Sequence, residues 1–192
     1  DKGDHAMFAS LDRAAFNGML GATIFEAWTG VAPEFRTPEA VANMAAWGFY
    51  PHVNLGWAQC PSLNASDPSQ AYILPYWRIL AKGDPEGVRT FNSPSDRRAS
   101  VRPRTAEFGA MVYREPGGRL LVIAANLTGA PARAALDLDA EILGLKGMYA
   151  VRRVDSATGA ETDAGTTETV LETSGLPAWG LEGFLLTPLE PR

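Results

Sequence analysis

The spacing of hydrophobic residues along this chain changes near Phe108. Before that point the apolar residues that show a pattern recur at helical spacing, and after it they alternate or fill short runs. A period near 3.6 is typical of helices that bury one face, and a period of two is typical of strands. The pattern predicts an α+β chain in two parts: a helical and loop segment over residues 1–107, and an antiparallel β-sandwich over residues 108–192.

Short strands separated by turns account for the second part. Phe108–Glu115 and Arg119–Leu127 flank Pro116-Gly117-Gly118, which predicts a hairpin. Leu120 to Ala125 is apolar at every position, as in a central strand covered on both faces. Further strands are predicted at 132–139, with one face in water, and at 149–154, 167–173 and 181–187. Short strands with no long helix among them indicate a sandwich.

Two capping signals predict helices in the first part. Thr37-Pro38-Glu39 combines an N-cap residue, a proline suited to the first turn and an acid that favours the helix dipole. This helix should end near Trp47, just before Gly48. Asp67-Pro68 repeats the signal, and Pro75 is expected to kink or restart the helix that follows.

The start of the chain and the stretch before Phe108 are less regular. A helix is plausible from Ser10, and the run Ala22–Phe25 is equally compatible with a buried strand that ends at Glu26. From Gly83 to Arg104 the chain is rich in turn residues, which predicts a linker. Its basic cluster of Arg97, Arg98, Arg102 and Arg104 is typical of a solvated segment, because it lies among prolines and serines without aromatic residues.

Composition restricts the function classes. Hydrophobic residues make up 46% of the chain and charged residues 20%, which is sufficient for a packed core. A net charge of -5 argues against a nucleic-acid partner, since phosphate binding needs a concentrated basic surface. No apolar run approaches the roughly 18 residues of a membrane span, so no membrane partner is expected.

Metal and cofactor sites are not expected either. Cys60 is the single cysteine, and His5 and His52 lie far apart without ligands at metal-binding spacing. No phosphate-binding glycine loop or nucleophile elbow is present. The chain begins with Asp1 rather than Met, as a processed protein or an excised piece would, so a missing signal peptide does not indicate the cytoplasm. The sequence does not determine the cellular compartment, although an extracellular or periplasmic location is favoured.

Several segments form a pattern known from carbohydrate-active enzymes. Gly118 to Thr128, an apolar strand ending in Asn and a small polar turn, resembles the signature strand of the C-terminal sandwich in many glycoside hydrolases. Val154-Asp155 with Thr158-Gly159-Ala160-Glu161 resembles the hairpin that follows there, and Leu181–Leu186 the closing strand. Gly48–Pro51 and Leu74–Leu80 look like the last segments of the preceding barrel in (β/α)8-barrel glycosidases of the α-galactosidase/α-amylase-like type.

This resemblance implies the C-terminal part of such an enzyme: the end of the barrel followed by a sandwich that packs against it. A whole barrel needs about 250 residues, so the remainder of the barrel would lie upstream. The parent would cleave glycosidic bonds in a carbohydrate, and this chain alone would be inactive. The family's pair of barrel carboxylates has no match here, so no catalytic residue is carried over.

Glu26 is the candidate catalytic carboxylate that the residues themselves offer. Glycoside hydrolysis usually needs two carboxyl groups flanking the scissile bond. Glu26 follows an apolar run, where a barrel strand would deliver a side chain to the active face, and Trp28 could stack on a sugar. An ordinary carboxylate at a helix or loop end beside a core tryptophan is the alternative, and Glu34 and Asp67 are weaker candidates.

His52 and Trp57 are candidate sugar contacts within an aromatic loop that also holds Trp47, Phe49 and Tyr50. Flat rings suit the apolar faces of sugars, but the same rings could simply pack the loop onto the core. A non-catalytic carbohydrate-binding or surface-interaction module is the alternative function. It would need exposed aromatic side chains, for which Tyr149 and Trp179 are the sandwich candidates. A purely structural protein would show neither turnover nor binding.

Two Asn-x-Ser/Thr sequons complete the motifs: Asn64-Ala65-Ser66 and Asn126-Leu127-Thr128. The second lies at the end of a predicted strand. Both occur often by chance and by themselves do not indicate glycosylation.

Overall fold

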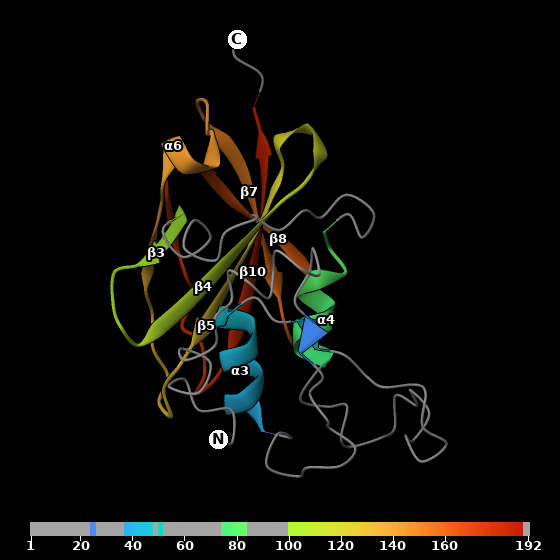
Figure 1. Cartoon of the computed structure of the whole chain (residues 1–192), viewed down its shortest axis with the longest axis vertical. Helices are drawn as coiled ribbons and strands as arrows, with labels where there is room; N and C mark the ends of the chain where they lie inside the picture. Colours follow the sequence, from blue (N-terminus) through green and yellow to red (C-terminus); the bar gives the residue numbers. More distant parts are fainter. Residues whose placement is uncertain (1–23, 26–36, 48–49, 52–73, 84–99, 190–192) are drawn as a thin grey trace.

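The structure, a computed structural model, describes residues 24–25, 37–47, 50–51, 74–83 and 100–189 (Figure 1). These residues hold a β-rich part after residue 100 and two helices with a short strand pair before it. The predicted helix from Ser10 and the predicted helix start at Asp67-Pro68 lie outside the described residues.

A five-stranded antiparallel sheet forms the centre of the molecule. Its order is β4-β5-β10-β7-β8. The strands are β4 (Phe108–Arg114), β5 (Leu120–Asn126), β7 (Tyr149–Asp155), β8 (Glu161–Thr167) and β10 (Leu181–Pro188). β5 lies between β4 and β10 and is buried at every position, which confirms that Leu120–Ala125 belongs to a central strand.

The predicted hairpin turn between β4 and β5 is the short 3-10 segment Pro116–Gly118. Gly117 and Gly118 have φ values of 79° and 81°, in the region that favours residues without a Cβ. The Glu115 amide donates to the Arg119 carbonyl at 2.9 Å and closes the turn.

A second antiparallel sheet has the order β3-β6-β9, with β3 (Val101–Pro103), β6 (Ala135–Leu138) and β9 (Val170–Glu172). In β6 the buried residues Leu136 and Leu138 alternate with partly exposed Ala135 and Asp137, as the period-two pattern predicts. The short helix α6 (Ala140–Leu143) follows. The carboxylate of its N-cap, Asp139, accepts from the Ile142 amide at 3.0 Å.

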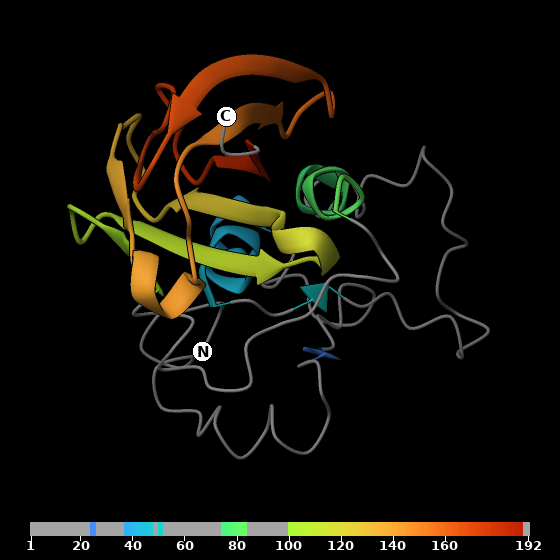
Figure 2. The same cartoon turned by 90° about the horizontal axis from the view of Figure 1, so that it is seen from above.

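The two sheets pack face to face around one apolar core (Figure 2). This core takes Leu136 and Leu171 from the smaller sheet, and Val122, Tyr149 and Phe184 from the larger one, all buried. The antiparallel two-sheet architecture predicted for the second part is therefore observed, and its shared core is that of a β-sandwich.

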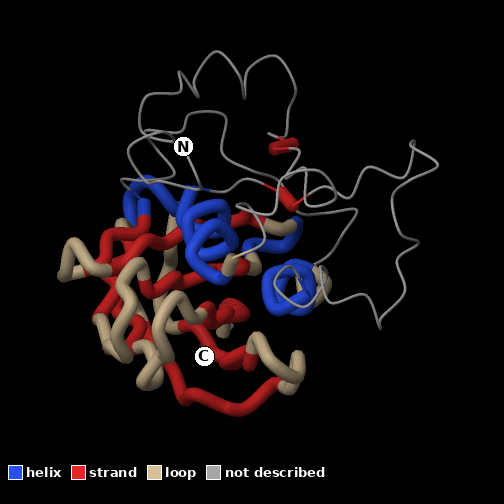
Figure 3. Tube along the Cα trace, turned by 90° about the horizontal axis from the view of Figure 1, so that it is seen from below, coloured by secondary structure: helices blue, strands red, loops and turns tan. Residues whose placement is uncertain are grey.

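Two helices cover the other face of the five-stranded sheet. They are α3 (Pro38–Trp47) and α4 (Leu74–Leu80). Figure 2 shows α3, in blue, against β4 and β5, and α4, in green, at the side of the same sheet; Figure 3 gives the view from below. The described residues thus form three layers: the small sheet, the large sheet and the helices.

The bounds of α3 confirm the capping argument. The Thr37 carbonyl accepts from the Val41 amide at 3.2 Å, as an N-cap carbonyl does, and the helix ends at Trp47. α4 has Pro75 as its second residue, a position where the missing backbone donor of proline is tolerated.

A small parallel ladder lies beside the helices. β1 (Ile24–Phe25) pairs with β2 (Tyr50–Pro51), with Ile24 opposite Tyr50 and Phe25 opposite Pro51. The ambiguous run before Glu26 therefore ends in a strand. Since α3 lies between β1 and β2 in the chain, the three elements form a β-α-β unit.

The sequence analysis missed two strands. Val101–Pro103, which was assigned to the linker, is β3 and pairs with β6. Glu161–Thr167 forms β8, whose residues are mostly exposed. β8 is a polar edge strand and lacks the apolar alternation on which the prediction depends. β3 contains Pro103, which is unfavourable inside a sheet but is tolerated in an edge strand such as this one.

Candidate functional site

The candidate site residues Glu26, Trp28, His52 and Trp57 all lie outside the described residues, as do Glu34 and Asp67. Their roles stay predictions. The described backbone reaches the positions before two of them: Phe25 and Pro51, which precede Glu26 and His52 in sequence, are partners in the parallel ladder.

The most extensive apolar surface of the described sheet is its helix-facing side, the docking face. It consists of Met111, Tyr113, Leu121, Ile123, Ala125, Val154, Leu181 and Leu185, each at most 5% exposed. Val41, Ala42, Ala45 and Ala46 of α3 and Tyr76, Ile79 and Leu80 of α4 cover it. Burying an aliphatic or aromatic side chain contributes about 1.5–3 kcal/mol, so this layer is a main source of stability.

Two strand glycines let the helices approach this face closely. A Cβ on Gly109 of β4 would lie 2.3 Å from the Ala46 Cβ, and one on Gly183 of β10 would lie 2.5 Å from Ile79 Cγ2. Both distances are shorter than carbon atoms tolerate, so α3 and α4 can occupy their positions only because side chains are absent there. The sequence analysis did not single out these glycines. Their position inside apolar strands is the signal that could have found them.

A buried pair of tyrosines also links α4 to the sheet. The hydroxyl groups of Tyr76 and Tyr113 lie 3.2 Å apart, and neither residue is exposed. A buried hydroxyl needs a partner, and this pair satisfies that need across the interface.

Polar contacts fix the outer side of α4 to the turn between β7 and β8. Arg78 donates to the Ala157 carbonyl, and Lys82 Nζ lies 3.1 Å from Glu161 Oε1. Arg152 of β7 lies 3.3 Å from the other oxygen of Glu161. The turn that resembled a glycosidase hairpin therefore contacts the outer side of α4, in addition to the packing of this helix on the sheet.

Asp155 shapes this turn. Its Oδ1 accepts from the Thr158 hydroxyl and from the Thr158 amide, each at 2.7 Å. These two hydrogen bonds stabilise the charged form and hold the pKa of Asp155 below its ordinary value.

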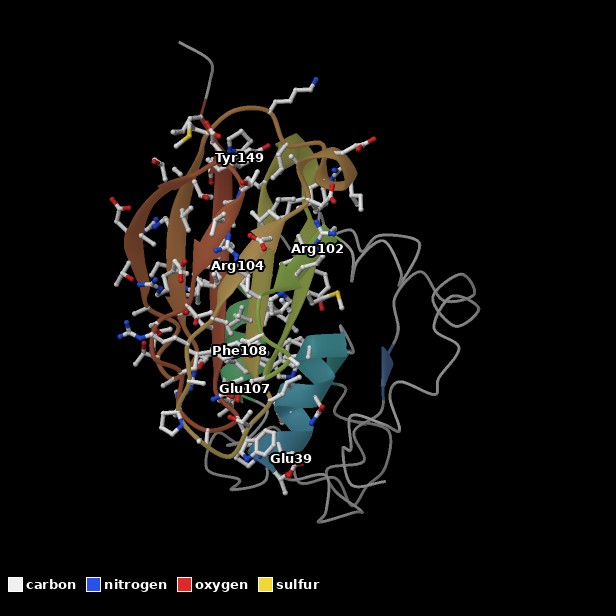
Figure 4. The ribbon with its side chains drawn as sticks, turned by 90° about the vertical axis from the view of Figure 1, so that its left-hand side faces the viewer. Glu39, Arg102, Arg104, Glu107, Phe108 and Tyr149 are labelled. Atoms are coloured by element: carbon white, nitrogen blue, oxygen red, sulfur yellow. The ribbon has the colours of Figure 1, made fainter. Side chains whose placement is uncertain are left out.

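The outer face of the three-stranded sheet has a different character. Arg104 Nε donates to Asp137 Oδ1 at 3.0 Å and Arg104 Nη2 to the same oxygen at 2.7 Å, while Arg102 lies 3.4 Å from Asp139 (Figure 4). The hydrogen bond with Arg104 lowers the pKa of Asp137, and the same bond raises the pKa of Arg104. Both arginines are exposed, so the solvated character predicted for them holds, although Arg102 belongs to a strand.

An ion pair between two neighbouring strands of the five-stranded sheet also contacts the end of β9, and its carboxylate is buried. Arg153 Nε of β7 lies 3.0 Å from Glu182 Oε1 of β10, and Glu182 Oε2 accepts from the Ser174 amide at 2.8 Å. Arg153 also donates to the Glu172 carbonyl at 3.0 Å. These contacts attach the end of β9 to the large sheet, a structural role that the period-two pattern gave no reason to expect.

The sandwich aromatics do not form a sugar-binding platform. Tyr149 is 4% exposed within the core between the sheets, and Trp179 is half-buried against the docking-face cluster. In the described part of the sandwich the exposed large apolar side chains are Ile142, Met148 and Leu189, none of them aromatic. The surface that a carbohydrate-binding module requires is therefore not present there.

Within the described ranges no group of three or more His, Cys, Asp or Glu side chains could hold a metal ion. No helix among these residues is long and apolar enough to cross a membrane.

No family model matches the chain, and no curated protein matches it either. Three solved structures similar to it are a GH27 β-L-arabinopyranosidase from Geobacillus stearothermophilus, a putative α-galactosidase/melibiase from Bacteroides fragilis and α-galactosidase I from Mortierella vinacea. Sequence identities are 13%, 18% and 10%, and TM-scores are 0.43, 0.45 and 0.43.

The alignments cover 88%, 79% and 78% of this chain but 44%, 29% and 35% of those proteins. The chain thus spans less than half the length of each.

Proposed function

We propose that this chain is the C-terminal portion of a carbohydrate-active glycoside hydrolase, in which the sandwich packs against the last β/α units of a (β/α)8 barrel. The observation that carries the proposal is the β1-α3-β2 unit together with the docking face: a parallel strand pair joined by a helix, with α3 and the following α4 buried against the five-stranded sheet.

A parallel ladder of this size supports the barrel interpretation. β1 and β2 are two residues long in the described chain, and parallel sheets are stable when several strands pair and helices cover them. Among the described elements, the order from β1 to α4 is β-α-β-α, which is the repeating order of a barrel. The remaining strands and helices would come from chain upstream of Asp1.

The sandwich then has a structural role. It presents an apolar face with two glycine positions that accommodate the outer helices of the barrel, and its opposite face is charged. A sandwich built for this role needs no aromatic platform, which is why we favour it over a carbohydrate-binding module.

Glu26 remains the candidate acid, with Trp28, His52 and Trp57 as candidate sugar contacts. Glu26 and His52 are the residues that follow β1 and β2 in sequence, and barrel enzymes carry their active sites at the carboxyl ends of the strands. Two carboxyl groups are needed for glycoside cleavage, and the partner of Glu26 would come from the upstream barrel.

The test is hydrolysis of a panel of nitrophenyl glycosides by the chain alone. We expect no release of nitrophenol above the buffer rate, because the second carboxylate and most of the substrate site are missing. Sustained turnover that Glu26→Gln abolishes would overturn the fragment interpretation and identify a complete site in the first 107 residues.

A further inference from the structure

The side chain of Asn126 is fully buried at the end of β5, although its sequence context is a glycosylation sequon. An acceptor asparagine must present its amide nitrogen to solvent and carry a bulky glycan there. The burial of Asn126 conflicts with that requirement, so the contacts of its amide decide which role it has.

All the hydrogen-bonding capacity of the Asn126 amide is used. Its Nδ2 donates to the Ala130 carbonyl at 2.7 Å and to the Pro177 carbonyl at 2.8 Å. Its Oδ1 accepts from the Thr128 amide at 3.0 Å and from the Thr128 hydroxyl at 2.9 Å. An amide group offers two donor hydrogens and two acceptor lone pairs, and here each has a partner.

These bonds connect two loops that lie far apart in sequence. Beside the Pro177 contact, the Asn126 backbone amide donates to the Gly180 carbonyl at 2.9 Å, and the Trp179 amide donates to the Thr128 carbonyl at 3.0 Å. The 126–130 turn and the 177–180 turn are thereby held as one unit.

The backbone of Trp179 shows what this unit maintains. Its φ is 56°, in the left-handed region that large side chains rarely adopt, and it is the non-glycine residue with positive φ in the part of the chain that the structure describes. Such a conformation costs about 1–3 kcal/mol and persists only where surrounding contacts enforce it. The Asn126 and Thr128 bonds on either side of Trp179 supply that enforcement.

We infer that Asn126 is a positioning residue for the Trp179 turn and that a glycan on its Nδ2 and the folded sandwich exclude each other. Glycosylation forms an N–C bond at Nδ2 in place of one N–H. It would remove the donor to Ala130 or to Pro177 and would force a sugar between two carbonyl groups in a closed interior. Thr128, which completes the sequon, is explained by its two bonds to Asn126 Oδ1.

This inference does not depend on the proposed function, since it concerns the sandwich alone. The first test expresses the 192-residue chain in a secretory eukaryotic host and measures occupancy of Asn126 by peptide mass spectrometry. The matched control is Ala164→Asn, which creates an Asn-x-Thr sequon with Gly165 and Thr166 on exposed β8.

We expect the folded, secreted protein to carry no glycan at Asn126, while the Ala164→Asn variant is glycosylated at position 164. Glycan at Asn126 in folded, secreted protein whose Tm equals that of the unglycosylated chain made in bacteria would overturn the inference.

The second test separates the positioning role from glycosylation by using protein made in bacteria. Asn126→Asp replaces both donors of Nδ2 with an acceptor facing two carbonyls, and we expect the Tm to fall by roughly 5 °C or more. Thr128→Ser keeps the hydroxyl and should change the Tm little, whereas Thr128→Val removes it and should lower the Tm in a variant that still folds. If Thr128→Val and Asn126→Asp both have the same Tm as the unmodified chain, Asn126 does not position this turn.

Discussion

The two outer faces of the sandwich differ in their surroundings: helices cover one, and solvent contacts the other. On the docking face, Leu121, Ile123 and Leu185 are buried under α3 and α4, and Gly109 and Gly183 leave room for the helix backbones. On the outer face of the three-stranded sheet, Arg104 and Asp137 form an exposed ion pair. One face is stabilised by close packing and the other is compatible with water.

This difference indicates where the sandwich meets the rest of the protein. A free-standing sandwich would be expected to carry polar residues on both outer faces, because alternation along each strand separates core from solvent. Here the central strands β5 and β10 of the five-stranded sheet are apolar on both sides, since Val122 and Phe184 face the other sheet while Ile123 and Leu185 face the helices. Such a sheet is an internal layer, and the helices belong to its fold.

Truncation of the docking face should have the largest effect. Ile123→Ala removes a fully buried side chain beneath the helices, and we expect the free energy of unfolding to fall by about 2–5 kcal/mol because a cavity is left. Denaturant titration of the 192-residue chain measures this change.

The matched variant on the opposite face is Asp137→Ala, which breaks the exposed pair with Arg104. Exposed ion pairs contribute little, so its denaturation midpoint should stay close to that of the unmodified chain. If Ile123→Ala and Asp137→Ala lowered the free energy of unfolding equally, the two faces would not differ in their contribution to stability.

A methyl group at Gly109 should have an intermediate effect. Its nearest neighbour would be the Cβ of Ala46 at 2.3 Å, which cannot rotate away, so α3 must shift. We expect Gly109→Ala to cost about 1–3 kcal/mol of unfolding free energy, as overpacking does. Gly129→Ala is the control, because its closest neighbour would be Trp179 Nε1 at 4.0 Å. If the two variants have the same stability, α3 is not held tightly against β4.

The smallest expected effect is the pH dependence of stability that Asp155 gives to the turn between β7 and β8. Hydrogen bonds from Thr158 lower the pKa of Asp155 in the folded protein below its ordinary 3.8. The carboxylate therefore stabilises the fold above its unfolded-state pKa, and this contribution is lost as the pH falls through the folded pKa. The Tm difference between the unmodified chain and Asp155→Ala should be present at neutral pH and narrow below pH 3.8. A difference that grows on acidification would contradict this assignment.

Much of the fold follows from local sequence signals. The apolar run at Leu120–Ala125 predicted a central strand, and Thr37-Pro38 predicted the start of α3, because both signals depend on nearby residues. β8 and β3 could not be predicted in this way. Their residues are polar or include a proline, and they form strands because an adjacent strand offers hydrogen bonds.

The candidate site could be predicted less well than the fold. Glu26, Trp28, His52 and Trp57 were selected by chemistry, and they lie outside the described residues. Gly109 and Gly183, which let the helices approach the docking face, were missed, because they acquire meaning only when α3 and α4 are placed against them. Sequence pattern indicates which residues a strand buries, but not which partner covers the strand.

The most direct test of the internal-layer account is the behaviour of residues 100–192 expressed without the helices. Removal of α3 and α4 would expose the docking face, and contiguous apolar surface of this kind promotes association. We expect this fragment to bind an apolar dye strongly and to self-associate in light scattering, in contrast to the 192-residue chain. A monomeric fragment with weak dye binding and an unchanged cooperative melting transition would contradict the internal-layer account.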